Sequence, residues 1–455
     1  MVTTFSPNCT FPDRSVNYVE SPPLRSTLDI VWPCVLTLIA SIYTALHLDV
    51  IADTAATSPC KCKWCGKRWL YNRICRDIRG LAVGLGVATI ALLAPELIVT
   101  RALLEMYWCK KALQRLEKLA KLEPNILLQW TKTHCYYLNM GGLRLVGCRG
   151  RFASHGTSPG APCDCNEMAL DRDSLALAIQ YGLLPKEPPV TKQEILDLSK
   201  TGAFAKILAI WQLTWFMVDL VTRLARHLPI SQLEVGVAGF AMLAFATWFF
   251  YFSKPKGVNV GTRVRFRIPQ SEFDPPQHQF EEVSFARTLS AVRPSSDNEV
   301  HDLLTRRLKD AEVDFIARSR SLWAEIVHHI SWGGDSSGEQ LFISLILGAV
   351  IALPFGAIHV AAWNAAFPTV AGQWLWRVSS LVSMLVLLVS LIIATSGGNV
   401  YRQWLDDYAY WTVDCCLVLY TAARVILMVE MVRCMLFLSP EAYVRSWAGD
   451  VPHLG

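Results

Sequence analysis

The sequence predicts an all-α protein, built as a polytopic bundle of transmembrane helices. Hydrophobic residues make up 52% of the 455-residue chain and charged residues only 18%, whereas an ordinary soluble protein carries about 25% charged residues. The mean hydropathy is +0.30. The apolar residues also cluster into separate stretches, several close to the roughly 20 residues that cross a bilayer as a helix. A buried core helix of a soluble enzyme would explain one such stretch but not all of them.

Six of these stretches are predicted to span the membrane. The second and third of them, separated only by the turn RHLPIS, are expected to form a hairpin. The last is long and carries charged residues within its apolar sequence. The six predicted spans are 28–50, 203–221, 233–252, 341–363, 378–395 and 410–438.

A seventh apolar stretch, 81–99, is less regular. Its uninterrupted apolar part runs from Leu81 to Ala94 and ends at Pro95-Glu96. Apolar runs of about 10–14 residues are more often re-entrant, interfacial or buried than spanning. The sequence therefore leaves two alternatives open for this segment, a full crossing or a re-entrant loop.

Lys and Arg near the ends of spans favour the cytoplasmic side of a membrane. The connections 61–79, 101–121 and 254–267 are basic, whereas 364–374 carries no Asp, Glu, Lys or Arg and is expected to be external. The basic connections share the cytoplasmic side only if 81–99 enters the membrane without crossing it. The resulting order is a luminal or extracellular tail (1–27), a first span with the cysteine-rich connection and second segment (28–100), a cytoplasmic connection (101–202), a hairpin (203–252), a second cytoplasmic connection (253–340), three spans (341–438) and a C-terminal tail (439–455).

The first large connection begins with a predicted basic helix at 101–122. Its apolar stripe of Ala112, Leu116 and Leu119 suits either anionic lipid headgroups or packing on its own domain. Residues 150–190 are expected to form an irregular loop. Thr191 and Glu194 then match a capping box that opens a short helix.

The second large connection is predicted to contain a short strand around Val264, Phe266 and Ile268, where apolar residues alternate with polar ones. A long amphipathic helix is expected at 297–330, with Ser296 as its cap. Its apolar stripe would dock on the first connection or pair with a second copy of the chain, which makes a homo-oligomer one of two alternatives.

The usual catalytic signatures are missing, including a phosphate-binding loop, an H-E-x-x-H helix and a G-x-S-x-G elbow. No catalytic residue, cofactor, metal site or nucleic-acid partner is therefore predicted, and no small-molecule ligand can be named. The sequon at Asn8 would be glycosylated only on the luminal side.

The basic run CKCKWCGKRWLYNRICRDIRG (60–80) raises three alternatives. Its cysteine spacing is not that of a standard zinc site. On the cytoplasmic side, juxtamembrane Cys60, Cys62 and Cys65 are candidates for acylation or stay as free thiols. On the external side, disulfides would be favoured instead.

The clearest functional candidates are charged residues within apolar stretches, where each charge costs about 2.5–3.5 kcal/mol on insertion scales. Such charges normally face one another or a wet cavity. They are therefore expected to form either structural ion-pair locks, with Glu430 pairing Arg433 and Asp219 pairing Arg223, or a transport path. The full set is Glu96, Asp219, Arg223, Asp414, Arg424, Glu430 and Arg433.

Several short motifs, in order along the chain, resemble those of a group of fungal polytopic membrane proteins without an assigned activity. They are STLDIVWPC…ALHLDV (26–50), APEL (94–97), YYLNMGG (136–142), LPISQLEV (228–235), YFSKPKGV (251–258) and the terminal VPHLG (451–455). The resemblance implies a multi-pass membrane protein and carries no catalytic residue with it. The expected location is the plasma membrane or an endomembrane. The predicted function is that of a non-enzymatic sensor, scaffold or regulator, with a channel or transporter as the alternative.

Overall fold

The computed structural model describes residues 24–47, 65–122, 129–148, 165–169, 175, 179, 187–199, 203–258, 261–265, 338–396 and 402–447, and it is mostly helical. Within these residues, four helices are long and apolar enough to cross a membrane: Thr27–Ala45, Phe204–Ala225, Gln232–Phe250 and Cys415–Phe437. A fifth candidate is the bent pair Gly80–Leu93 and Pro95–Lys118, if the two count as one span, and Ile346–Ala361 is a shorter apolar helix.

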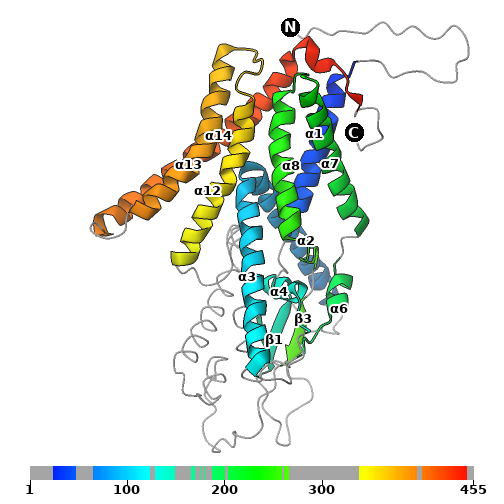
Figure 1. The fold of residues 1–455 in the computed structure, drawn as a ribbon. Coiled ribbons are helices and arrows are strands. Elements are labelled where there is room, and N and C mark those ends of the chain that lie inside the picture. Colours follow the sequence, from blue (N-terminus) through cyan, green and yellow to red (C-terminus); the bar gives the residue numbers. More distant parts are fainter. Residues whose placement is uncertain are drawn as a thin grey trace, which may run out of the picture.

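The long helices form two groups around a central helix (Figure 1). Helix α8 (Gln232–Phe250) packs against α1 (Thr27–Ala45) and α7 (Ala203–Ala225) on one side, and against α12 (Gly338–Ala361) on the other. Helices α13 (Val370–Ser396) and α14 (Arg402–Cys434) complete the second group. The α7–α8 hairpin was predicted from the sequence and is present.

Local sequence sets where several helices begin. Ser26 and Asp29 form a capping box at the start of α1, and Ser231 and Glu234 form one at the start of α8. The predicted capping box of Thr191 is confirmed at the start of α6 (Lys192–Asp197). In each case a hydroxyl accepts a backbone N–H that has no partner inside the helix.

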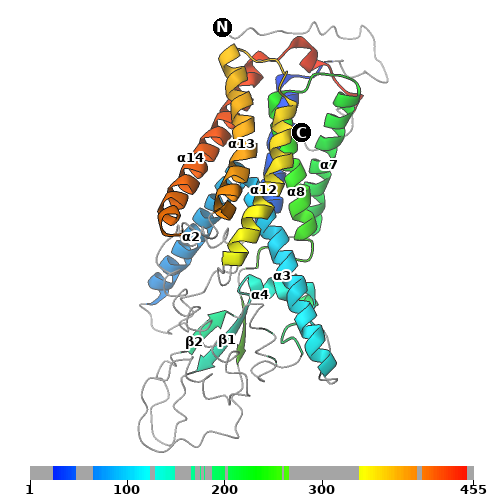
Figure 2. The same ribbon diagram turned by 60° about the vertical axis from the view of Figure 1, so that its left-hand side comes forward.

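The irregular apolar stretch is broken into two helices. Helix α2 (Cys65–Leu93) ends where Ala94 interrupts the helix, and α3 (Pro95–Leu122) begins at the proline, at an angle of 106°. Proline has no backbone N–H to donate and is favoured at the first position of a helix. Both helices run from the break toward the end of the bundle that carries the strands (Figure 2).

The predicted helix at 101–122 is thus the greater part of α3. Its stripe residues Ala112 and Leu116 are buried, and Ala112 packs in a cluster with Cys135 and Tyr136 of α4 (Lys132–Asn139). Of the two alternatives for this stripe, packing on its own domain is therefore present for Ala112 and Leu116.

The strand-bearing end contains a small sheet that the all-α prediction missed. Strand β1 (Leu143–Cys148) pairs antiparallel with β2 (Cys165–Ala169) and parallel with β3 (Thr262–Arg265), in the order β2-β1-β3. Strand β3 overlaps the predicted strand at Val264. Strand β2 lies inside 150–190, where an irregular loop was expected.

The sheet is fastened to α4 through the YYLNMGG motif. The hydroxyl groups of Tyr137 and Thr262 lie 2.9 Å apart, and the backbone N–H of Thr262 donates to the carbonyl of Gly142 at 2.6 Å. A Cβ at position 142 would lie 2.3 Å from the Tyr137 ring, so only glycine allows this close approach.

Several predicted features lie outside the described residues. They are the sequon at Asn8, the cysteines Cys60 and Cys62, the strand positions Phe266 and Ile268, and the helix at 297–330. Cys65 is the first residue of α2 and Asp414 lies within α14, but neither side chain is among those described.

Candidate functional site

The break between α2 and α3 leaves backbone groups without helical partners inside the bundle. The carbonyl of Leu93, the last residue of α2, accepts a hydrogen bond from Nε of Arg424 at 2.9 Å. The Tyr420 hydroxyl lies 3.3 Å from the same oxygen. Such groups must be satisfied inside the protein when no water surrounds it, and α14 supplies both contacts.

The charges at the break suit the helix ends beside them. Glu96 lies in the first turn of α3, where the helix dipole favours a negative charge, and Arg424 binds the end of α2, where it favours a positive one. Both side chains are buried, each residue being 1% exposed. The Tyr420 hydroxyl donates a hydrogen bond to Oε1 of Glu96.

Aromatic rings enclose the Arg424 guanidinium group. Its central carbon lies 4.3 Å from the centre of the Phe355 ring and 5.7 Å from that of Phe240. The centres of the His359 and Phe355 rings lie 4.9 Å apart, and Nδ1 of His359 donates to the Phe355 carbonyl at 2.9 Å. Side chains of α3, α12 and α14 therefore meet in one buried charge cluster, defined as Glu96, His359, Tyr420 and Arg424.

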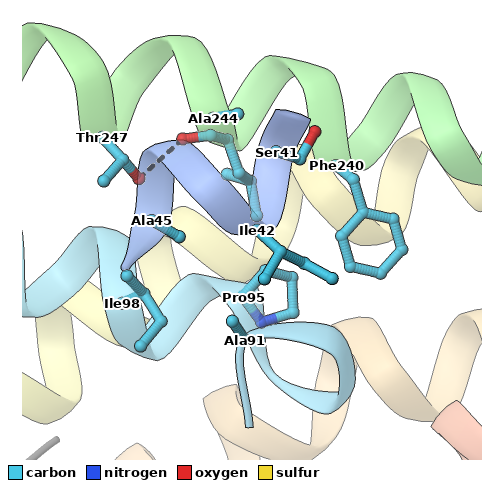
Figure 3. A pocket seen from close by; sticks show the side chains of 10 residues that line it. Ser41, Ile42, Ala45, Ala91, Pro95, Ile98, Phe240, Ala244 and Thr247 are labelled. Carbon is cyan, nitrogen blue, oxygen red and sulfur yellow. Dashed lines mark hydrogen bonds between the residues drawn. The ribbon is translucent and has the colours of Figure 1, made fainter. Parts of the chain in front are cut away.

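A small cavity lies beside the break between α2 and α3 (Figure 3). Its volume is about 20 Å³, and its walls are mainly apolar. Pro95 and Phe240 line it together with residues of α1, α2 and α8. The hydroxyl of Thr247, another lining residue, is already bonded to the Leu243 carbonyl at 2.9 Å.

One of the predicted ion pairs is confirmed. Nη2 of Arg433 lies 2.9 Å from Oε2 of Glu430, and the same nitrogen donates to Thr369 at 3.1 Å. Glu430 is buried, whereas the Arg433 side chain is 35% exposed. This pair fastens the end of α14 to the loop before α13.

The second predicted pair is wrong. Arg223 donates to the carbonyls of Pro229, Ala442 and Val444 instead of to Asp219, at 2.8, 3.1 and 2.8 Å respectively. The Asp219 carboxylate accepts from the hydroxyl of Ser446. Both side chains bind the segment that follows α14, because that segment crosses the ends of α7 and α8.

The same end of the bundle contains a buried ion pair that was not predicted. Nη1 of Arg25 lies 2.6 Å from Oε1 of Glu234, and Nε of Arg25 also donates to the Ala442 carbonyl at 2.8 Å. Leu24 forms an isolated antiparallel bridge with Val444. The LPISQLEV motif, which contains Glu234, is the sequence signal for this contact.

A further buried network at the opposite end was also missed. Glu105 of α3 binds Arg101 and Lys254, each at 2.7 Å. Lys256, two residues further on, packs over the Tyr43 ring, and burial followed by the nearby charge of Lys206 lowers the pKa of Lys256 to about 7. The YFSKPKGV motif carries both lysines, but nothing in it names Glu105 as the partner.

His134 has a defined structural role at the start of α4. Nδ1 of His134 accepts from the backbone N–H of Thr131 at 3.0 Å, and Nε2 donates to the Val190 carbonyl at 2.9 Å. Burial lowers the pKa of His134, because it disfavours the charged ring. In the part of the chain that the structure describes, no group of three or more His, Cys, Asp or Glu side chains could hold a metal ion.

Comparison with known proteins gives one match. Residues 2–270 match the model of a family of unknown function (DUF8562), which covers more than half of the chain and includes Glu96 but not Arg424. No curated protein and no solved structure matches the chain. The chain therefore belongs to this family of unknown function (DUF8562).

Proposed function

We propose that this chain is a multi-pass integral membrane protein that acts as a non-enzymatic scaffold, sensor or regulator. One observation carries the membrane part of the proposal. Large apolar side chains are exposed on the outer faces of the long helices, with Leu28 at 73% and Phe204 at 75%, while Glu96 and Arg424 are buried. An exposed apolar surface of this kind is a liability in water but suits contact with lipid.

The proposed spans are α1, α7, α8, α12, α13 and α14, with α2 and α3 as a re-entrant elbow. Exposed Trp32 and Trp447 lie toward the end that holds the bridge between Leu24 and Val444, and exposed Tyr107 lies toward the sheet. Trp and Tyr are enriched at membrane interfaces. Helix α8 has 19 residues and is therefore about 28 Å long, which is close to the thickness of the hydrocarbon core of a bilayer.

The scaffold role is favoured because the buried charges bind other parts of the same chain. Arg424 caps α2, Arg433 holds Glu430, and Glu105 joins α3 to the turn after α8 through Lys254. In this arrangement α3 links the bundle to the sheet, so the proposed interaction unit is the sheet-bearing end. Its location in the plasma membrane or an endomembrane, and a homo-oligomer through 297–330, are further parts of the proposal.

A channel or transporter is the second candidate, and one observation favours it. Broken helices with charged residues at the break are typical of transporter binding sites. The α2–α3 break, with Glu96 and Arg424 beside it, has this form. The adjoining cavity is small and mainly apolar, which favours the scaffold role instead.

The two functions are separated by reconstituting the purified protein into liposomes that contain a pH-sensitive dye, with potassium and chloride gradients applied in turn. The scaffold role predicts fluxes equal to those of protein-free liposomes. A flux abolished by Glu96→Gln but kept by Glu441→Gln, a change at an exposed position beyond α14, would establish the transport function and overturn the scaffold proposal.

A further inference from the structure

Four side-chain atoms of the buried charge cluster make no hydrogen bond within the described part of the chain. They are Oε2 of Glu96, Nη1 and Nη2 of Arg424, and Nε2 of His359. About nine in ten buried polar atoms have a hydrogen-bond partner, and each exception lowers the stability of the folded state. Four exceptions in one place call for a physical cause.

The four atoms are chemically complementary. Nδ1 of His359 faces a carbonyl, which only accepts, so Nδ1 carries the proton and Nε2 presents a lone pair. Oε2 of Glu96 is likewise an acceptor, whereas both terminal nitrogens of Arg424 are donors. The cluster therefore contains two acceptors and two donor nitrogens that do not reach one another.

The atoms also share one neighbourhood. The guanidinium group of Arg424 and the ring of His359 both pack against Phe355, at 4.3 and 4.9 Å. Glu96 is held to α14 by Tyr420, one helical turn before Arg424. The donors of Arg424 and the acceptor of His359 therefore share the Phe355 ring, and Tyr420 holds the Glu96 acceptor to the same helix as Arg424.

We propose that internal water molecules bridge Arg424 to Glu96 and to His359. Water supplies both donors and acceptors, and buried waters typically make about three hydrogen bonds to such groups. The charges of Glu96 and Arg424 balance, so a neutral ligand fits the site better than an additional anion. The bridged chain links α3, α14 and α12.

A nearby cavity shows that the packing between α8 and the α2–α3 break leaves room for a water molecule, although none of the four atoms lines that cavity. Its volume of about 20 Å³ exceeds the roughly 10–15 Å³ that one water needs. Phe240 lines this cavity and also lies 5.7 Å from the guanidinium carbon of Arg424. The inference goes beyond the proposed function, because the hydration site is the same in a scaffold and in a transporter.

Hydroxyl-radical footprinting of the full chain in nanodiscs tests the site, because radicals formed from internal water modify the side chains beside it. Phe355 is the reporter and Phe216, which is buried in an apolar cluster, is the matched control. We expect Phe355 to be oxidised at least several-fold faster than Phe216, although Phe355 is the less exposed, at 2% against 6%. Equal or slower oxidation of Phe355 would overturn the proposal.

Variants of the cluster and a change of anion test the same site further. The double variant Glu96→Leu/Arg424→Leu removes the polar partners without leaving a lone charge, and should reduce Phe355 oxidation to the Phe216 rate. If this variant does not fold, His359→Leu removes one acceptor and should give a partial reduction. Unchanged oxidation in a folded variant, or oxidation that changes when chloride is replaced by gluconate, would overturn the proposal, the latter result indicating a bound anion.

Discussion

Replacing Arg424 by methionine tests whether the buried charge cluster stabilises the fold. Methionine keeps an unbranched apolar stem but loses the hydrogen bond from Nε to the Leu93 carbonyl and the positive charge near Glu96. A hydrogen bond to a charged group contributes about 1.5–3 kcal/mol. Removing one member of a buried charge pair costs about 3–5 kcal/mol in total, because the other charge is left uncompensated.

We therefore expect Arg424→Met to lower the free energy of unfolding by about 3–5 kcal/mol. Arg226→Met is the matched control, since that side chain is exposed just after the end of α7. Exposed charged side chains contribute about 1 kcal/mol or less. Steric trapping in bicelles measures unfolding free energy in a membrane-like medium and suits both variants.

A double-mutant cycle identifies the cause of the loss. If Glu96 is the charge that Arg424 compensates, Glu96→Gln should offset about 1–3 kcal/mol of the cost of Arg424→Met. A cost below about 1 kcal/mol for Arg424→Met, equal to that of the Arg226 control, would refute the assignment of Arg424 as a structural lock.

Two further predictions concern the sheet-bearing end. The lowered pKa of His134 means that the unfolded chain binds more protons near pH 6.5, so the stability of α4 should fall as the pH drops from about 6.5 through the folded pKa. Hydrogen exchange of α4, corrected for intrinsic rates, should show this loss of stability in the wild type and in the exposed-site control His227→Asn. The variant His134→Asn should not show it. Equal pH dependence in all three proteins would contradict the role assigned to His134. Gly142→Ala should destabilise the protein by about 1–3 kcal/mol, because its Cβ meets the Tyr137 ring at 2.3 Å. In the control Gly348→Ala the nearest atom to the added Cβ is 3.7 Å away, so this change should leave the midpoint of thermal unfolding unchanged or raise it. Equal effects of the two changes would show that the contact with Tyr137 does not cause the destabilisation.

The sequence predicted the helices well because long apolar runs and capping boxes are local signals. Thr191 with Glu194 shows this, since four consecutive residues mark the start of α6. The break at Pro95 was also visible, because proline and the end of the apolar run coincide. The strands β1 and β2 were missed because each is short and is stabilised by pairing across a sequence gap.

The candidate site was only partly visible for the same reason. Glu96 and Arg424 stood out because a charge in an apolar stretch is conspicuous. Their partners did not, since Tyr420 and the Leu93 carbonyl reach them only through packing of α14 on the elbow. The wrong pairing of Asp219 with Arg223 has a related cause, because one-turn spacing permits an ion pair but cannot show that the C-terminal segment competes for both side chains.

In the proposed topology, α2 and α3 enter the membrane and return to the same side, beneath a bundle of six spans. Labelling single reporter cysteines in a cysteine-free variant with an impermeant maleimide tests it, at positions 62 and 121 beside the elbow and at 227 and 364 in the opposite loops. In intact cells we predict labelling at 227 and 364, and labelling at 62 and 121 only after permeabilisation. Labelling of positions 62 and 121 from opposite sides would show that the elbow crosses the membrane and would contradict this account.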